Sequence, residues 1–248
     1  MASETDFLLA VEDLTVAFDG FRAVDRLTFY MDQSELRVVI GPNGAGKTTL
    51  LDLICGRTKA TAGSIRFRNQ ELTALREHQI VHAGVGRKFQ TPSIYEDLTV
   101  LENLEISFPR GRTVFGALAF RRDAAVRERI AEVAEAVFLQ DALRRRAEFL
   151  SHGQKQWLEI GMLLIQDPAL LMLDEPVAGM SVAERAKTAE LLRRIIRTRS
   201  VLVIEHDMVF VESIADKVTV LHQGRIIAEG SMAQVKADPH VVEVYLGH

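Results

Sequence analysis

The stretch GPNGAGKTT at residues 41–49 has the composition of a loop that binds phosphate. The pattern G-x-x-x-x-G-K-T/S is met by Gly41, Gly46, Lys47 and Thr48. Glycines let successive backbone N–H groups turn toward phosphate oxygens, and a following helix adds the partial positive charge of its N-terminus. The Lys47 ammonium can then reach the β- and γ-phosphates, and the Thr48 hydroxyl can bind Mg²⁺. The pattern therefore predicts a site for a nucleoside triphosphate.

A pair of acidic residues follows a second apolar run. Residues 170–173 read LLML and lead into Asp174 and Glu175. An acid at the end of a buried strand can hold Mg²⁺ through water, and a carboxylate beside the γ-phosphate can orient and deprotonate the attacking water. Alone, such a pair is usually a solvated turn. The presence of Lys47 and Thr48 in the same chain favours the catalytic interpretation.

Two further polar residues stand at the ends of predicted strands. Gln90 ends VGRKFQ and His206 ends VLVIEH. Ligands of open α/β sheets bind beyond the carboxyl ends of the strands, so we expect both residues in one crevice with Gly41 and the 174–175 pair. There the Gln90 amide could bridge Mg²⁺ and the attacking water and so respond to the γ-phosphate. Either residue alone would be more simply explained as a packed or surface side chain.

The stretch LSHGQKQW at residues 150–157 suggests a second anion site. Ser151 and Gln154 fit a capping box, so a plain helix start explains both of them. Gly153 is less well explained, because glycine inside a first helical turn costs about 1 kcal/mol relative to alanine. A helix N-terminus with a serine hydroxyl and an unobstructed glycine N–H is a good receptor for a γ-phosphate.

The apolar pattern predicts the elements that position these residues. Alternating apolar residues predict early strands around Leu14, Val16 and Phe18 and around Leu27, Phe29 and Met31. Further strands are predicted at 35–41, 63–69, 85–90, 170–176 and 201–207, helices at 47–55, 181–198 and 208–215, a hairpin at 217–230 and two short closing helices. Strands buried on both faces explain the continuous apolar runs, so the sequence favours an α/β fold with a parallel core.

The middle of the chain interrupts this α/β pattern. From about 92 to 165 the spacing is helical, as in RDAAVRERIAEVAEAVFL, which predicts an inserted helical subdomain. Residues 107–122 are less regular and carry Pro109, Gly111 and Gly116, so we interpret them as an insertion or loop. Residues 1–91 and 166–248 then form the catalytic core of a single domain spanning 1–248.

Composition excludes several classes of protein. Apolar residues make up 48% of the 248 residues, which is enough for a sizeable core, and a net charge of −4 gives no general attraction to nucleic acid. Cys55 is the only cysteine, so neither an internal disulfide nor a cysteine-based zinc site is possible. No window reaches the roughly 18 apolar residues of a membrane span, and the acidic start does not fit a signal peptide. Any membrane role is therefore expected to come through a partner.

Taken together, these motifs resemble the ATP-binding subunit of ABC transporters over essentially the full length of the chain. Residues 41–49 match the Walker A loop, Gln90 the Q-loop, 150–154 the signature loop, 170–175 the Walker B strand with its catalytic glutamate, and His206 the switch histidine. The resemblance implies a P-loop NTPase with a RecA-like parallel sheet, an N-terminal antiparallel β subdomain and an inserted α-helical subdomain.

The resemblance also implies the chemistry of the site. It implies ATP with Mg²⁺ as the cofactors, Glu175, His206 and Gln90 as catalytic residues, and Thr48, Gln90 and Asp174 near the metal. It places a base-stacking aromatic at Phe18. The implied nucleotide-binding residues are Phe18, Gly41, Pro42, Asn43, Gly44, Ala45, Gly46, Lys47, Thr48, Thr49, Ser151, Gly153 and Gln154.

The same family explains why one chain carries two anion loops. Its ATP-binding domains pack head to tail, and the Walker loop of one and the signature loop of the other enclose each ATP. The expected partners are therefore an identical or similar ATPase subunit, two membrane permeases and, indirectly, a periplasmic binding protein. The expected location is the cytoplasmic side of the inner membrane, held there by the permeases.

Two stretches, 86–105 and 150–164, look most like subunits that drive uptake of branched-chain amino acids and, closer still, of urea or short amides. Our primary expectation is therefore a urea or amide importer ATPase, and the alternative is a branched-chain amino acid importer. The insertion at 107–122 is typical of one of the two ATPase subunits in such systems.

Two departures from the family pattern stand out. His152 replaces a usual glycine, and Ser181 replaces a frequent aspartate that communicates across the dimer.

Functions of other classes fit less well. ABC ATPases that act on nucleic acid or ribosomes usually carry two fused cassettes, a long coiled coil or zinc inserts, and this chain shows none of these. A simple P-loop nucleotide kinase or GTPase would not need the LSHGQ stretch, and the base-specificity motif of a GTPase is missing from the sequence. We therefore expect no nucleic-acid partner.

Overall fold

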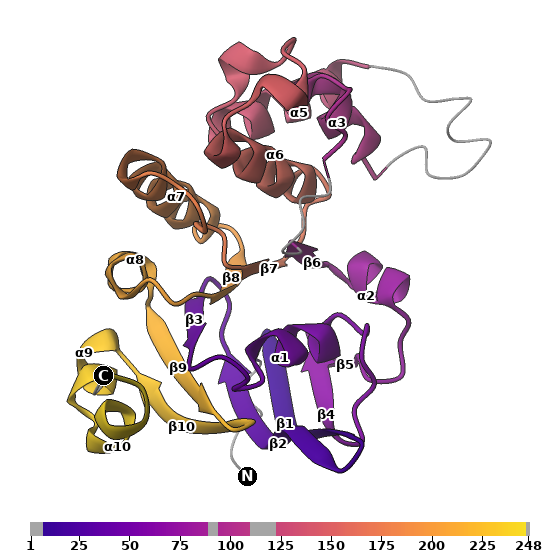
Figure 1. Cartoon of the computed structure of the whole chain (residues 1–248). Coiled ribbons are helices and arrows are strands. Elements are labelled where there is room, and N and C mark those ends of the chain that lie inside the picture. Colours follow the sequence, from indigo (N-terminus) through magenta and orange to yellow (C-terminus); the bar gives the residue numbers. More distant parts are fainter. Residues whose placement is uncertain (1–6, 89–93, 110–122, 247–248) are drawn as a thin grey trace.

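The computed structural model describes residues 7–88, 94–109 and 123–246 (Figure 1). Its centre is a six-stranded sheet in the order β10-β9-β3-β8-β7-β6. Strands β9, β3, β8, β7 and β6 run parallel, and β10 returns antiparallel to β9 as the predicted hairpin. The bounds are β3 (Leu36–Ile40), β6 (Val85–Lys88), β7 (Leu170–Asp174), β8 (Ser200–Ile204), β9 (Lys217–His222) and β10 (Arg225–Gly230).

A second, antiparallel sheet is formed by the early part of the chain, as predicted. Its order is β2-β1-β4-β5, with β1 (Leu9–Phe18), β2 (Phe21–Met31), β4 (Ala62–Phe67) and β5 (Gln70–Glu71). Leu14 and Val16 of β1 are buried, whereas Phe18 at its end is 49% exposed. The predicted alternation therefore holds along the strand and fails at the turn, where β1 and β2 meet.

The inner strands β3, β7 and β8 of the central sheet are buried on both faces, which explains their continuous apolar runs. In β8, Val201 and Val203 belong to one core, and Leu202 and Ile204 belong to the other. Successive strand residues point to opposite faces, so both faces must be apolar when both are covered. One core includes residues of the later helices, and the other includes residues of the antiparallel sheet and of the helix that follows the Walker loop.

Helices cover these faces, and several gather in a separate body at the top of Figure 1. That body contains α3 (Val100–Ile106), α5 (Ala124–Ala136) and α6 (His152–Leu164). The other helices are α1 (Lys47–Ile54), α2 (Glu77–Ala83), α7 (Val182–Ile195), α8 (Met208–Ile214), α9 (Met232–Ala237) and α10 (Pro239–Val241), followed by a π-helical turn at Val242–Leu246. Within the described ranges, no helix combines the length and the apolar character needed to cross a membrane.

Among the polar contacts that connect α6 to the rest of the molecule, two are made by buried side chains at both ends. The Trp157 indole N–H donates to the Thr188 hydroxyl at 2.9 Å, which joins α6 to α7. The Lys88 ammonium lies 3.4 Å from a Glu159 carboxylate oxygen, which joins the end of β6 to α6. All four side chains are buried. Movement of α6 relative to the sheet would therefore disturb buried polar partners as well as apolar packing.

Candidate functional site

The loop between β3 and α1 needs glycine at two positions. Gly41 has φ +149°, and a Cβ there would lie 2.1 Å from the Leu221 carbonyl oxygen. Gly46 has φ +101° and would bring a Cβ within 2.4 Å of the Ala23 carbonyl oxygen. Both conformations are rarely adopted by residues with side chains, and both clashes are with backbone. The glycines of the predicted phosphate loop are therefore required by close backbone approach as well as by turn geometry.

Lys47, the first residue of α1, closes this loop on itself. Its Nζ donates to the carbonyl oxygens of Gly41 at 2.7 Å and Pro42 at 3.0 Å. Burial lowers the pKa of Lys47, and the negative charges of Glu175 and Asp174 oppose that shift. The ammonium therefore lies near both acids that the sequence predicted.

A cavity of about 320 Å³ lies against the loop. Its lining residues are Phe21, Ala23, Asn43, Gly44, Ala45, Gly46, Lys47, Thr48, Thr49, Glu175 and Ile204. The aromatic side chain at this cavity is that of Phe21, which is 65% exposed. Phe18, the residue expected to stack on a base, is its partner across the β1–β2 turn and is not among the lining residues. Phe21 was not among the residues predicted from the sequence, although its place beside the hairpin turn was a usable signal.

Asp174 has the properties of a metal ligand. It ends β7 and is 2% exposed, and neither carboxylate oxygen makes a hydrogen bond of normal distance and angle with another described residue. Burial raises the pKa of Asp174, while the charge of Arg87 and the Thr48 hydroxyl act to lower it. A buried carboxylate left with unused oxygens, beside a threonine hydroxyl, fits Mg²⁺, which prefers a few protein oxygens together with phosphate and water. The described residues hold no group of three or more His, Cys, Asp or Glu that could form an all-protein metal site.

Glu175 and His206 lie together, as the sequence predicted. His206 Nδ1 is 3.4 Å from Glu175 Oε1, and both side chains are partly exposed. Glu175 has φ +47°, and its N–H donates to the Ile204 carbonyl at 3.0 Å. The predicted strands at 170–176 and 201–207 therefore end earlier, at Asp174 and Ile204, because the chain turns there. This turn lets Glu175 face the cavity although Asp174 precedes it directly.

Glu205, which was not among the residues predicted from the sequence, fixes the backbone beside this pair. Its side chain is buried, with 1% of the residue exposed, and burial raises its pKa. One oxygen accepts the Val177 N–H at 3.2 Å, and the other accepts the His206 N–H at 3.0 Å. The carboxylate thus ties the turn that follows β7 to the turn that follows β8. The only signal in the sequence was a charged residue directly after an apolar run.

The predicted signature loop is the N-terminus of α6. Ser151 is the N-cap, and its capping box with Gln154 is present. The Ser151 hydroxyl also donates to Glu184 Oε1 at 3.0 Å. The His152 ring, which replaces the usual glycine, places Nε2 3.0 Å from the Ala178 carbonyl oxygen, and Ser181 forms the expected capping box with Glu184. Both departures from the family pattern are therefore accommodated by local contacts within the chain.

The structure does not bring the two anion loops together. Residues of the signature loop are not among those that line the cavity beside Lys47, and Figure 1 places α6 and α1 in different parts of the molecule. Gln90, predicted to touch both metal and water, lies outside the described residues, as do residues 110–122 of the predicted insertion.

Comparisons with known proteins also indicate an ATP-binding protein. The family described as "ABC transporter" matches residues 24–178, and the one described as "Branched-chain amino acid ATP-binding cassette transporter" matches residues 225–248. The high-affinity branched-chain amino acid transport ATP-binding protein BraF of Pseudomonas aeruginosa is 36% identical over 97% of this chain and 98% of its own length. LivG of Escherichia coli K12, which carries the same description, has the same identity and coverage.

The solved structures lead to the same conclusion. An ATP-binding cassette of an ABC transporter, solved in its ADP conformation, superimposes with a TM-score of 0.86 and is 32% identical over 98% of this chain and all of its own. The predicted fold class is confirmed by this match. The full-length similarity, together with the loop, acids and switch histidine described above, shows that the chain belongs to the ABC transporter family, as one of its ATP-hydrolysing, ATP-binding subunits.

Proposed function

We propose that this chain is an ATPase subunit of an importer for branched-chain amino acids. The observation that carries the proposal is the similarity, over nearly the whole chain, to ATP-binding proteins named for that transport. The match of residues 225–248 to a family named for the same solutes supports it independently. The comparisons favour branched-chain amino acid uptake over the urea or amide uptake that the stretches 86–105 and 150–164 suggested. Urea transport remains the outcome against which the proposal is tested.

ATP is assigned to the cavity beside Lys47. The backbone of the 41–49 loop and the N-terminus of α1 supply N–H groups for the phosphates. The Lys47 ammonium exchanges its bonds to the Gly41 and Pro42 carbonyls for phosphate oxygens. We assign base stacking to Phe21, because it lines the cavity and Phe18 does not. Thr48 and Asp174 would hold Mg²⁺, which when bound supplies positive charge to the phosphates.

Hydrolysis is assigned to Glu175 and His206. The Glu175 carboxylate lines the cavity and is partly exposed, so it can accept a proton from a water that attacks the γ-phosphate. His206, with Nδ1 3.4 Å from Glu175 Oε1, orients that carboxylate and can donate to a phosphate oxygen with its other ring nitrogen. Gln90 keeps its expected role beside the metal and the water.

The second anion loop is assigned to the nucleotide of a neighbouring subunit. Ser151, Gly153 and Gln154 lie at the N-terminus of α6, away from the cavity of their own chain. A head-to-tail pair of subunits would place each such helix end against the partner's γ-phosphate, so that two incomplete sites form two complete ones. The partner subunit can be a second copy of this chain or a similar ATPase.

Force transmission is assigned to the helical part of the chain. We propose that residues 92–165 form a subdomain that moves against the core of 1–91 and 166–248 when the γ-phosphate is lost, as in other nucleotide-driven switches. Two permease subunits would receive this motion and hold the ATPase at the cytoplasmic face of the membrane. A periplasmic binding protein would deliver the solute to them without touching this chain.

Solute uptake in a deletion strain tests the proposal. Cells that lack this gene should lose high-affinity uptake of labelled leucine and keep uptake of labelled urea. The wild-type gene supplied in trans should restore leucine uptake, and the Glu175→Gln gene, expressed to the same level, should not. Loss of urea uptake with leucine uptake intact would overturn the proposed solute while leaving the ATPase assignment in place.

A further inference from the structure

Arg87 is a buried cation between the two halves of the Mg²⁺ site. It lies in β6, and its side chain is 5% exposed. Nη1 donates to Asp52 Oδ1 at 2.6 Å and to Cys55 Sγ at 3.2 Å. Nη2 lies 3.9 Å from Asp174 Oδ2. One guanidinium therefore contacts α1 with one nitrogen and faces the end of β7 with the other.

The contacts on α1 fall on the face that carries Thr48. Thr48, Asp52 and Cys55 are spaced i, i+4 and i+7, so their side chains form one stripe along the helix. Fixing Asp52 and Cys55 against the guanidinium therefore fixes the rotation of α1 and the direction of the Thr48 hydroxyl. The same guanidinium faces Asp174, the other residue assigned to the metal.

Only an arginine can make this connection. Its planar fork offers donors on two nitrogens in a rigid geometry, whereas a lysine ammonium is a single point charge on a flexible stem. Asp174 ends a strand that pairs with β6, with Arg87 opposite Met172, so the guanidinium approaches Asp174 from the neighbouring strand. Its charge also partly offsets the cost of burying the Asp174 carboxylate.

We propose that Arg87 is a positioning residue for the Mg²⁺ site, because it sets the separation between the Thr48 hydroxyl on α1 and the Asp174 carboxylate on β7. The inference rests on the proposed function, since that function assigns both groups to the metal. Groups behind the direct ligands of a metal typically change its affinity 10- to 100-fold when they are removed. Loss of the Arg87 guanidinium should therefore weaken the Mg²⁺-dependent part of nucleotide binding and leave binding without Mg²⁺ unchanged.

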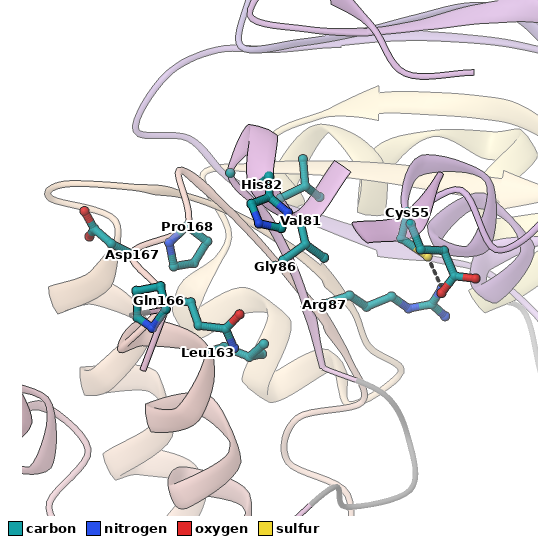
Figure 2. A pocket seen from close by; sticks show the side chains of 13 residues that line it. Cys55, Val81, His82, Gly86, Arg87, Leu163, Gln166, Asp167 and Pro168 are labelled. Atoms are coloured by element: carbon teal, nitrogen blue, oxygen red, sulfur yellow. Dashed lines mark hydrogen bonds between the residues drawn. The ribbon is translucent and has the colours of Figure 1, made fainter. Parts of the chain in front are cut away.

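The surroundings of Arg87 permit a clean substitution. Arg87 and Cys55 line a cavity of about 400 Å³ together with α2 and the residues that follow α6, including Gln166 and Pro168. Figure 2 shows the Arg87 side chain extending from β6 beside this space toward Cys55. A lysine at this position is shorter and keeps one positive charge, so it can enter without displacing the core.

The test compares two buried arginines. Arg37 in β3 also joins two carboxylates, Glu35 at 2.6 Å and Glu229 at 2.7 Å, but it has no contact with Asp174 or α1 among its described polar partners. Binding of a fluorescent ATP analogue is measured with EDTA and then during a Mg²⁺ titration, for the wild type, Arg87→Lys, Asp52→Asn and Arg37→Lys. Mn²⁺ binding in the ATP complex, followed by electron paramagnetic resonance, gives a readout that is independent of turnover.

We expect Arg87→Lys to bind the analogue as the wild type does in EDTA and to need about 10-fold more Mg²⁺ for half-maximal enhancement. Asp52→Asn should shift the Mg²⁺ requirement in the same direction, and Arg37→Lys should leave it unchanged even where it lowers the melting temperature. A wild-type Mg²⁺ requirement in both Arg87→Lys and Asp52→Asn would overturn the inference. If the wild type itself shows no Mg²⁺-dependent binding, the proposed metal site fails first and the role of Arg87 fails with it.

Discussion

The Glu184 carboxylate covers the N-terminal turn of α6 at Gly153. Glu184 Oε1 accepts the Ser151 hydroxyl at 3.0 Å, and a Cβ added to Gly153 would lie 2.4 Å from the same oxygen. Hydrogen bonds from Ser181, Ser151 and the Gly153 N–H lower the pKa of Glu184. The end of α6 therefore already holds an anion, supplied by its own chain, where the proposed function requires the partner's γ-phosphate.

Glu184→Gln should favour ATP-dependent pairing of subunits. A glutamine keeps the capping box with Ser181 and removes a negative charge from the place that a phosphate must enter. A charge at a helix end is worth about 0.3–1 kcal/mol, so we expect dimerisation to tighten by about two- to fivefold. Analytical ultracentrifugation with ATP, in a Glu175→Gln background that cannot turn over, measures this constant. Glu190→Gln serves as the matched control, because Glu190 lies in α7 as Glu184 does and is exposed.

An unchanged dimerisation constant in Glu184→Gln would contradict this prediction. The same variant without ATP should remain monomeric to the same extent as the parent, because the carboxylate competes only with the phosphate. Stronger pairing in the absence of nucleotide would instead show that Glu184 acts on the protein surface in general.

Glu175→Gln should stop turnover and spare binding. The amide keeps the size of the side chain and cannot take a proton from water, and general-base catalysis typically contributes about 10²- to 10⁴-fold. We therefore expect the rate of phosphate release to fall at least about 100-fold with little change in ATP affinity. Glu212→Gln, an exposed residue paired with Lys236, controls for the loss of a carboxylate. Normal steady-state turnover in Glu175→Gln would remove the proposed base.

Lys47→Ala should lose nucleotide binding. The substitution deletes the ammonium assigned to the β- and γ-phosphates, and it also deletes the two bonds to loop carbonyls. Charge-assisted hydrogen bonds are roughly twice as strong as neutral ones, so we expect ATP affinity to fall by about 100-fold. Isothermal titration calorimetry measures the constant. An affinity close to that of the wild type would refute the assignment.

The phosphate loop and the acids were predictable because their signals are local. The loop at 41–49 lies between a strand and a helix, and Asp174 ends an unbroken apolar run, so short windows of sequence defined both. The pairing of Glu175 with His206 followed from one general rule, that parallel strands present their carboxyl ends at the same edge.

The remaining features depend on packing between distant segments. Gly153 was unexplained by a capping box, and in the structure the Glu184 carboxylate, 31 positions later in the sequence, lies against it. Arg87 meets Asp52 and Asp174 only after three elements have packed. Phe21 and Phe18 are equivalent in type and three residues apart, so only the geometry of the hairpin distinguishes which one faces the cavity.

Asp174→Asn should stabilise the nucleotide-free protein while it weakens Mg²⁺-dependent binding. The buried carboxylate makes no hydrogen bond of normal geometry with another described residue, and burial raises its pKa above the ordinary value of 3.8. The carboxyl proton of Asp174 is therefore bound more tightly in the native state than in the unfolded state. The stability that this proton contributes is fully present below the pKa of Asp174 in the unfolded state, and it is lost as pH rises through the pKa of Asp174 in the folded state. An asparagine has no carboxyl group to ionise, so the Asp174→Asn protein does not lose this stability as pH rises.

The expected gain in the free energy of unfolding is about 1 kcal/mol near neutral pH, within the range of about 0.5–2 kcal/mol that single stabilising substitutions commonly give. Urea denaturation without nucleotide measures this gain. The difference from the wild type should shrink toward zero as pH falls below 3.8, because Asp174 then becomes mostly protonated in the unfolded as well as in the folded protein. Asp141→Asn, at an exposed position, should show no gain at either pH. A destabilised Asp174→Asn protein near neutral pH would mean that the attraction of the Arg87 charge outweighs the cost of burying the carboxylate. The carboxylate would then be held chiefly as an ion pair rather than kept free for a metal.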